Sequence, residues 1–229
     1  MADNPVPWYN KTMILQNFAV IEGCDGSGTT TQLTLLKTRF EISAFPFFAT
    51  CEPTGGPVGT LIRRILRGET AVMKETMARL FAADRAEHLY APGGIEDRCR
   101  RGELVVSDRY SPSSLVYQGI ECGPSLPRQL NDSFPDPELL IYLDIDSGTA
   151  LERLESRKNR DIYEGPDFQI RVRDAYRELL PVYEKAGVRV LFLDGTAPRE
   201  KLAEEIWRAL EEMPIFKKTP GNRHPAAPS

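Results

Sequence analysis

Five short apolar segments recur along the chain, and segments with a helical pattern separate them. The apolar segments are residues 17–23, 45–53, 103–110, 138–146 and 189–195. They are rich in valine, isoleucine, phenylalanine and leucine without strict alternation, which is typical of strands covered on both faces. Between them apolar residues return at helical spacing, as in Leu202, Ile206 and Leu210. Alternating strands and helices predict an α/β protein with a doubly wound parallel sheet.

The first apolar segment leads into GCDGSGTTTQ, residues 23–32, which nearly matches a phosphate-binding loop. That motif reads GxxxxGK with Ser or Thr next, because backbone N–H groups cradle the phosphates and the lysine brings positive charge to the transferring one. Thr29 stands where the lysine is expected. The strand before the loop and the helix after it still place a phosphate at a helix N-terminus. We therefore predict phosphate binding without the lysine, with a structural glycine turn as the alternative.

Several side chains could act beside this loop. Thr30 occupies the motif position whose hydroxyl reaches Mg²⁺. A carboxylate such as Asp25 inside the loop repels phosphate unless it contacts a metal, a sugar hydroxyl or an arginine, although it could also cap a turn. We predict Asp108 near the metal and Arg109 on a phosphate, against the alternative of a surface ion pair. Ligands of such sheets lie beyond the strand ends, which are marked here by Gly23, Glu52, Asp108 and Asp146.

The segment KETMARLFAADRAEHLY, residues 74–90, has Phe81 and Arg85 one helical turn apart. An aromatic ring that stacks on a base, beside an arginine that bonds the base edge, would make a nucleobase-binding site. Taken by itself, the helix favours a core phenylalanine and a solvated arginine.

The segment SRKNRDIYEGPDF, residues 156–168, is polar and basic and has no apolar face, which favours a hinged flap over a site. Some of its basic neighbours are ordinary helix surface. An arginine brought in by lid closure can stabilise the transferring phosphoryl group as an arginine finger does. We predict that Arg157 or Arg160 replaces the charge that Thr29 lacks. Less favoured sources of this charge are Arg153, Arg63 and Arg64.

Composition narrows the function classes. The chain has 229 residues, enough for one sizeable core, and its net charge of -4 argues against the broad basic surface of a nucleic-acid or membrane binder. Its four cysteines and two histidines are dispersed and suggest neither a zinc site nor a disulfide framework. No apolar run approaches the ~20 residues of a membrane span, and the N-terminal sequence does not match a signal peptide. We expect a cytoplasmic protein without nucleic-acid or membrane partners.

Taken together, these residues resemble the thymidylate kinase family. The similarity runs from about Asn17 to Met213 and rests on motifs in family order and spacing: EGCDGSGTTTQ, EPTGGPVG, LFAADRAEH, DRYSPSSLVYQG, and YLDID with ALERL. The resemblance implies a five-stranded parallel sheet flanked by helices, of the P-loop nucleotide kinase type, with a small lid. It implies a reaction in which ATP and dTMP give ADP and dTDP, with Mg²⁺ as the metal ion. It also implies a homodimer. The expected organisation is one kinase domain over 17–213, a lid at about 156–168, and flexible tails at 1–16 and 214–229.

The resemblance also assigns roles to residues. ATP phosphates would lie on the loop formed by Gly23, Cys24, Asp25, Gly26, Ser27, Gly28, Thr29 and Thr30. Phe81 would stack on thymine and Arg85 would bond its edge. The resemblance thus replaces the earlier expectation of a core phenylalanine and a solvated arginine on this helix. Tyr117 would occupy the space that a ribose 2′-hydroxyl needs. Metal ligands would be Thr30 and Asp108. The acceptor pocket would comprise Asp25, Pro53, Phe81, Arg85, Arg109, Ser114, Tyr117 and Gln118, and the catalytic groups would be Arg157, Arg160, Arg109 and Asp25.

The sequence departs from the family pattern at three positions. Thr29 replaces the loop lysine, Cys51 stands where the family has an arginine that touches the acceptor phosphate, and Ile162 falls where many members have a lid arginine. Loss of one preorganised transition-state donor costs about 10² to 10³ in rate. An active dTMP kinase is the leading hypothesis. A catalytically silent nucleotide-binding protein is the second, and a kinase for another acceptor, such as a nucleoside without its 5′-phosphate, is the third, although Arg109 argues against it.

Overall fold

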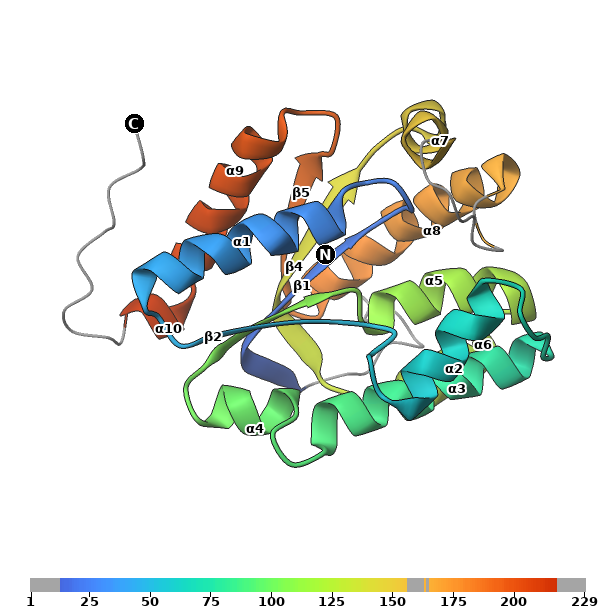
Figure 1. Ribbon diagram of the computed structural model, residues 1–229, viewed down its shortest axis with the longest axis horizontal. Helices are drawn as coiled ribbons and strands as arrows, with labels where there is room; N and C mark the ends of the chain where they lie inside the picture. The colour runs from blue at the N-terminus through green and yellow to red at the C-terminus, as the bar shows by residue number, and fades with distance from the viewer. Residues whose placement is uncertain (1–12, 156–162, 164, 218–229) are drawn as a thin grey trace, which may run out of the picture.

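A computed structural model describes residues 13–155, 163 and 165–217. Within them, five strands form one sheet in the order β2-β3-β1-β4-β5, and every neighbouring pair is parallel (Figure 1). The strands are β1 (Ile14–Gly23), β2 (Phe47–Cys51), β3 (Leu104–Asp108), β4 (Asp136–Asp144) and β5 (Arg189–Asp194). The predicted five-stranded parallel α/β fold is confirmed. Each predicted apolar segment overlaps one strand, although β1 and β4 begin before their segments, at Ile14 and Asp136.

Helices connect the strands. They are α1 (Thr29–Ser43), α2 (Pro57–Leu66), α3 (Lys74–Tyr90), α4 (Ile95–Arg100), α5 (Ser111–Cys122), α6 (Ser125–Asn131), α7 (Ser147–Glu155), α8 (Pro166–Lys185), α9 (Arg199–Glu211) and α10 (Pro214–Lys217). Proline stands in the first turn of α2, α5 and α8, where its missing N–H costs no helical hydrogen bond. In the described part of the chain, no helix combines the length and apolar character needed to cross a membrane.

Helices cover both faces of the sheet (Figure 1). On one face, Ala19 and Ile21 of β1 pack in a cluster with residues of α1 and α9. On the other face, Phe18 and Val20 pack with residues of α3 and α4, while Tyr142 of β4 packs with residues of α5 and α8. All five side chains are fully buried. Because both faces are covered, consecutive residues in the middle of the strands are apolar, as in residues 18–21 of β1, which explains why the sequence shows continuous runs instead of alternation.

At the N-terminal side, the predicted boundary at residue 17 is wrong, because β1 begins at Ile14. Ile14 already pairs with Asp136 of β4. The pairing is then interrupted between Leu15 and Ala19, where Asn17 has a φ of 66°. A polar residue in the left-handed region breaks the apolar pattern, so the sequence placed the start of the strand too late.

At the C-terminal side, residues 214–217 do not belong to a flexible tail, because they form α10. Ile215 is 8% exposed and belongs to the same cluster as α1 and α9. The ring of Phe216 stacks on Phe45, with centroids 4.4 Å apart. Two apolar residues are too few to give a helical periodicity, so the sequence did not reveal this contact.

Replacing Ile215 with alanine should lower the free energy of unfolding by about 2 to 4 kcal/mol, because it removes buried methylene groups and leaves a cavity. Urea unfolding followed by circular dichroism measures this change. Ile42, in α1 and 74% exposed, is the matched control, and Ile42→Ala should change stability by less than about 0.5 kcal/mol. Equal effects of the two substitutions would contradict the docking of α10.

Candidate active site

The loop between β1 and α1 has a backbone that favours glycine. Gly26 and Gly28 have φ angles of 84° and 99°, in the left-handed region. Gly23 has no room for a side chain, because an added Cβ would lie 2.3 Å from Ser27 Oγ and 2.9 Å from the Leu143 carbonyl oxygen. The loop runs into the first turn of α1, where backbone N–H groups lack helical partners and can hold an anion.

The two threonines that begin α1 have different surroundings. Thr29, in the place of the motif lysine, is only 6% exposed, so no charge reaches the site from this position. Thr30 is exposed, and its Oγ1 donates a hydrogen bond of 2.6 Å to Asp108 Oδ2 at the end of β3. Asp108 Oδ1 is buried and has no hydrogen-bond partner among the described residues. A carboxylate beside a hydroxyl fits Mg²⁺, which takes one or two protein oxygens and completes its shell with water and phosphate oxygens.

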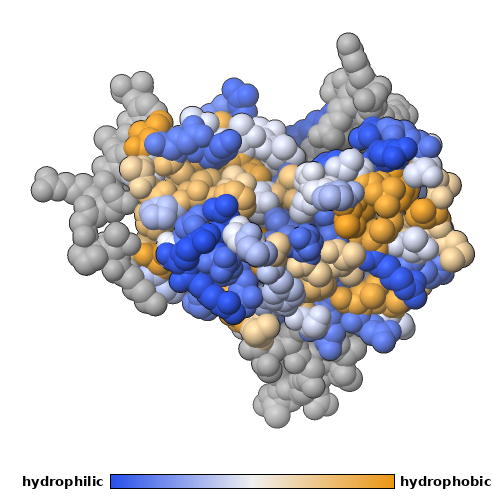
Figure 2. Space-filling model, turned by 60° about the horizontal axis from the view of Figure 1, so that its bottom comes forward, coloured by the Kyte–Doolittle hydropathy of each residue, from blue (hydrophilic) through white to orange (hydrophobic). Residues whose placement is uncertain are grey.

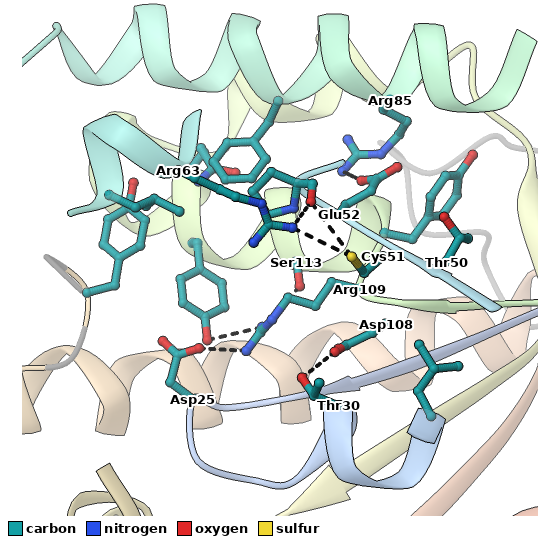
Figure 3. Close-up of a pocket in the computed structure, with 18 of the residues that line it drawn as sticks. Asp25, Thr30, Thr50, Cys51, Glu52, Arg63, Arg85, Asp108, Arg109 and Ser113 are labelled. Atoms are coloured by element: carbon teal, nitrogen blue, oxygen red, sulfur yellow. Dashed lines mark hydrogen bonds and ion pairs between the residues drawn. The ribbon is translucent and has the colours of Figure 1, made fainter. Parts of the chain in front are cut away.

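Arg109 links the loop to the end of β3 (Figure 3). Its backbone N–H donates to the Ile21 carbonyl at 3.0 Å, and its φ of 70° is a strained conformation of the kind found at functional sites. Its guanidinium donates to Asp25 Oδ1 at 2.6 Å and to the Gly23 carbonyl at 3.0 Å. Burial opposes its charge, but Tyr117 and Asp25 raise the pKa of Arg109 above its ordinary value. The Asp25 carboxylate thus contacts an arginine, which is one of the three partners expected for a carboxylate inside a phosphate-binding loop.

Glu22 is linked to Arg109 through Ser113, whose Oγ contacts both side chains, and it was not singled out from the sequence. Its carboxylate is fully buried and accepts hydrogen bonds from Tyr110 N at 2.9 Å, Ser113 Oγ at 2.6 Å and the Tyr176 hydroxyl at 2.7 Å. Burial raises the pKa of Glu22, although the charge of Arg109 and these hydrogen bonds oppose the shift. The available signal was an acidic residue directly after the apolar run of residues 18–21 in β1, because such residues are rarely buried without partners.

Gln169, in the first turn of α8, was also missed. It is 1% exposed, accepts a hydrogen bond from Asp25 N at 3.1 Å and donates one to Asp25 Oδ2 at 3.0 Å. Its Nε2 also donates to the Tyr163 carbonyl at 2.8 Å. Gln169 therefore ties the glycine loop to one residue of the predicted flap. No sequence signal could have found it, because it lies 144 positions from Asp25.

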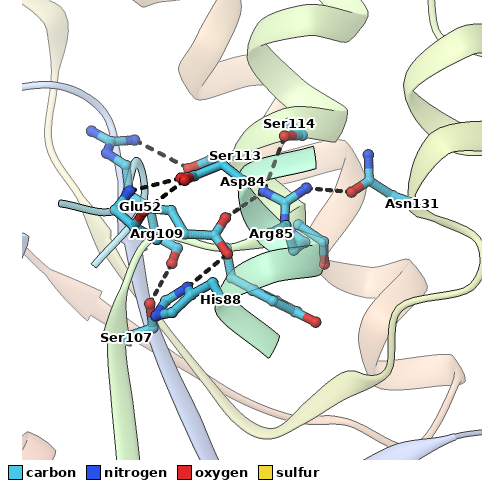
Figure 4. A network of polar contacts seen from close by, with 12 residues as sticks. Glu52, Asp84, Arg85, His88, Ser107, Arg109, Ser113, Ser114 and Asn131 are labelled. Atoms are coloured by element: carbon cyan, nitrogen blue, oxygen red, sulfur yellow. Dashed lines mark hydrogen bonds and ion pairs between the residues drawn. The ribbon is translucent and has the colours of Figure 1, made fainter. Parts of the chain in front are cut away.

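A second network surrounds Arg85, which is 1% exposed (Figure 4). Its Nη2 donates to Glu52 Oε2 at 2.6 Å and to Ser114 Oγ at 3.1 Å, and its Nη1 donates to Asn131 Oδ1. Its Nε is buried and has no hydrogen-bond partner in the described part of the chain. The helix α3, taken by itself, favoured a solvated Arg85. That expectation is wrong, because Glu52, which follows β2, supplies a buried counter-charge.

One cavity of about 420 Å³ brings the two networks together (Figure 3). Predicted site residues that line it are Asp25, Thr30, Pro53, Phe81, Arg85, Asp108, Arg109, Tyr117 and Gln118. Ser114 is not among the lining residues and contacts Arg85 instead. The Cys24 side chain is buried, with Sγ 3.9 Å from the Tyr142 hydroxyl, so only its backbone can face a ligand. A volume of this size suits a small ligand.

Asp146 does not line the cavity. The sequence placed it at a strand end beside the ligand, and that expectation is wrong. β4 ends two residues earlier, at Asp144. The Asp146 carboxylate accepts hydrogen bonds from Thr149 N at 3.0 Å and Thr149 Oγ1 at 2.7 Å. It acts as a cap at the start of α7, which is a common role for aspartate.

Most of the predicted flap, including Arg157 and Arg160, lies outside the described residues. Tyr163 is described and lines the cavity. Its ring stacks on Phe168 at 5.2 Å, and its hydroxyl donates to Glu121 Oε2 at 2.5 Å. Arg153 of α7 donates to the Gly26 carbonyl at 3.3 Å and to the Gly195 carbonyl at 3.1 Å, so this arginine contacts the glycine loop.

An ion-pair cluster anchors α8, which carries Gln169. Arg173 binds Asp144 in a bidentate manner, with N–O distances of 2.8 and 2.7 Å, and Arg177 adds a contact of 2.8 Å. Burial by itself raises the pKa of Asp144, but hydrogen bonds from Arg173 and Arg177 outweigh it and lower the pKa below the ordinary value. The carboxylate therefore favours the folded state while it is ionised.

Comparisons with known proteins agree on one family. The family model described as thymidylate kinase matches residues 21–206. A Treponema pallidum protein named "Putative thymidylate kinase" is 40% identical over 212 residues, which cover 89% of this chain and 99% of the relative. A Methanocaldococcus jannaschii protein named "Probable thymidylate kinase" is 39% identical over 88% of this chain and 100% of its own length. A Deinococcus radiodurans protein named "Thymidylate kinase" is 36% identical over 85% of this chain and 96% of its own length.

Asp144→Asn should lower the free energy of unfolding by about 1 to 2 kcal/mol at pH 7, because it weakens the charge-assisted hydrogen bonds from Arg173 and Arg177. The effect stays modest because the Arg177 side chain is half-exposed to solvent. The difference from the wild type should stay constant down to about pH 5 and shrink below about pH 4, because the native carboxylate must then be protonated. Urea unfolding at several pH values measures this.

Asp174→Asn is the control for this experiment, since Asp174 is exposed on the same helix. It should change stability by less than about 0.5 kcal/mol at every pH. A difference between Asp144→Asn and the wild type that widens toward low pH would contradict the ion-pair cluster.

Proposed function

Because the chain belongs to the thymidylate kinase family, we propose that it transfers the terminal phosphoryl group of ATP to dTMP and so forms dTDP. The glycine loop, the Asp25–Arg109 pair and the Arg85 network would each carry a part of this reaction. Such a transfer needs positioning and electrostatic stabilisation and involves no covalent intermediate.

The observation that carries the proposal is the unpaired Nε of Arg85. Both Nη atoms of Arg85 are held by protein acceptors, which leaves Nε as a buried donor without a partner among the described residues. A buried donor without a partner costs free energy that a ligand carbonyl can recover. Phe81 lines the same cavity and supplies a ring for stacking. A pyrimidine with a carbonyl on its edge fits both groups.

The sugar and phosphate of the acceptor would lie at the other end of the cavity. Arg109 would bind the phosphate, with its guanidinium already oriented by Asp25 and Gly23. Tyr117 is 6% exposed, and its hydroxyl accepts a hydrogen bond of 3.3 Å from Arg109 Nη1, so it is held in place. This fixed ring supports a preference for a 2′-deoxyribose, because an added hydroxyl would need the space of the ring.

The phosphates of ATP would bind the backbone N–H groups of the loop and of the first turn of α1. Thr30 and Asp108 would hold Mg²⁺, which neutralises charge that develops on the phosphates. The motif lysine is missing, so a cation must come from elsewhere. We keep Arg157 or Arg160 as the proposed source, with Arg153 already in contact with the loop at Gly26.

A homodimer and a cytoplasmic location are further proposals. Large hydrophobic side chains are exposed at Leu61 of α2 and at Val72 and Met73 before α3. Figure 2 shows apolar surface on the right of the visible face and a second, paler apolar band on its left. Exposed apolar patches mark interaction surfaces, which supports association with a second copy.

A coupled assay of ADP release with Mg-ATP tests the proposed function. We expect turnover with dTMP and no turnover with thymidine, because thymidine lacks the phosphate that Arg109 would bind. The kcat/KM for dUMP should be lower by about 10-fold or more, because dUMP lacks the methyl group of thymine and buries less apolar surface. ADP release with dTMP that does not exceed the background with ATP alone would contradict the proposal and favour a silent nucleotide-binding protein.

The double variant Arg157→Ala/Arg160→Ala should lower kcat by about 100-fold or more while the KM for dTMP changes little, because these side chains act on the transferring phosphoryl group. Steady-state kinetics separate the two parameters. Arg100→Ala/Arg101→Ala is the matched control, since both side chains are exposed at the C-terminal end of α4, where Arg101 is the cap residue, and neither lines the cavity. Unchanged turnover in the first variant would refute compensation by the flap.

A further inference from the structure

The buried ion pair of Arg85 and Glu52 departs from the geometry that such pairs commonly have. Their side chains are 1% and 3% exposed, yet within the described residues one hydrogen bond joins them, from Nη2 to Oε2 at 2.6 Å. An arginine and a carboxylate frequently form two parallel hydrogen bonds, which adds strength. Arg173 and Asp144 form such a pair in this chain, through Nε at 2.8 Å and Nη2 at 2.7 Å. Because Nε of Arg85 has no partner in the described part of the chain, another group must hold the second Glu52 oxygen.

His88 of α3 holds that oxygen. Its Nδ1 lies 3.2 Å from Glu52 Oε1, and among the described residues this ring is the one hydrogen-bond partner of Oε1. Figure 4 shows the Glu52 carboxylate between the Arg85 guanidinium and the His88 ring. An ionised carboxylate only accepts hydrogen bonds, so the ring must donate from Nδ1. A hydrogen on Nε2 alone would set a ring lone pair against the carboxylate.

Thr50 stabilises the ring in this form. Its Oγ1 lies 2.6 Å from His88 Nε2, and a hydroxyl can donate to a ring nitrogen that carries no hydrogen. The neutral ring with its hydrogen on Nδ1 therefore satisfies Thr50 and Glu52 together. The arrangement follows from two periodicities. Thr50 and Glu52 are two positions apart at the end of β2, and Arg85 and His88 are three positions apart on α3, so each pair lies on one side of its own element.

His88 lies behind the wall of the cavity. Its side chain is 9% exposed, and it is not among the residues that line the cavity, whereas Glu52 and Arg85 are. Any effect of His88 on a ligand must therefore pass through Glu52. Without the ring, Oε1 would be a buried acceptor without a donor, which costs free energy. The carboxylate would then turn to the Nε of Arg85, which is next to Nη2 on the guanidinium, as Asp144 does with Arg173.

We propose that His88 is a positioning residue for nucleobase recognition, because it holds Oε1 of Glu52 away from Arg85 and so keeps Nε free for a base carbonyl. This inference rests on the proposed function, since it concerns the base of the acceptor nucleotide. A buried donor that is built to bond a carbonyl rejects a base with an amino group in its place, because the donor then stays unpaired. His88 thus sets how strongly Arg85 discriminates between these two groups.

Calorimetric titration of the intact protein tests this inference. The ligands are dTMP and 5-methyl-2′-deoxycytidine 5′-monophosphate, which has an amino group in place of one thymine carbonyl. His88→Leu retains apolar bulk but no donor, so it should raise the Kd for dTMP by about 10- to 100-fold. The ratio of the two Kd values should shrink by about 10-fold or more, because Nε no longer faces the base.

Two further variants are matched to His88→Leu. His88→Asn should keep the Kd for dTMP within about threefold of the wild type, because its amide nitrogen can take the place of Nδ1 as the donor to Glu52. Glu87→Ala is the control, since Glu87 is exposed on the same helix and does not line the cavity. It should change neither Kd.

Nitrogen-15 NMR of the wild-type protein with labelled histidine gives a second test, which does not depend on the folding of any variant. The chain has two histidines, and the spectrum of His224→Gln identifies the signals of His88. We expect a hydrogen on Nδ1 of His88. A ring with its hydrogen on Nε2 alone would overturn the inference.

Three calorimetric results would also overturn it. His88→Leu that binds dTMP as tightly as Glu87→Ala does would show that the ring does not act on the site. Equal weakening of both nucleotides, with their ratio unchanged, would indicate a structural role. His88→Asn as weak as His88→Leu would refute the role of the Nδ1 donor. The proposed function fails by a different result, which is tight dTMP binding by the wild type without ADP release, and the ratio of Kd values still reports on His88 in that case.

Discussion

The parallel pairing of β1 with β3 is the constraint on which the site depends. In this register Ile21 lies opposite Asp108, the last residue of β3, and β1 continues for two more residues to Gly23. The glycine loop leaves β1 two residues later, and Arg109 leaves β3 one residue later. The Arg109 N–H bonds the Ile21 carbonyl, and its guanidinium then reaches Gly23 and Asp25. A shift of one residue would reverse the direction of every side chain of β3 and separate these groups.

Charge balance organises the cavity that this register creates. Asp25 neutralises half-buried Arg109, and Glu52 neutralises fully buried Arg85, so neither arginine is removed from water without a counter-charge. Breaking either pair would leave a buried charge, which is costly, so the pairs also hold the loop, α3 and the end of β2 in fixed positions. Among the charged residues that line the cavity in the described part of the chain, Asp108 and Arg63 have no ion pair, and these two charges match a cation and an anion. A magnesium ion and a phosphate monoester are ligands of these two classes.

The substitutions at positions 29 and 51 change where positive charge enters the site. Buried Thr29 retains the helix start but brings no charge, so the anion-binding capacity of the loop comes from backbone N–H groups and the helix dipole. Cys51 is likewise neutral, and Nη2 of Arg63, from α2, lies 3.6 Å from its sulfur. Such relocation is possible because electrostatic stabilisation depends on the position of a charge relative to the phosphate and not on the element that carries it.

The sequence by itself determined the order of strands and helices, the glycine loop and the residues that follow the strands, because these features depend on periodicity and on backbone conformations that only a few residues adopt. Only the tertiary structure decided that Arg63 and not Arg64 lines the cavity, that Gln169 holds Asp25, and that Asp146 caps a helix. Ile215 likewise packs on α1 and α9 without a local signal. Periodicity reports which face of an element is buried, whereas the partner of a side chain more than a hundred positions away is set by sheet register and helix packing.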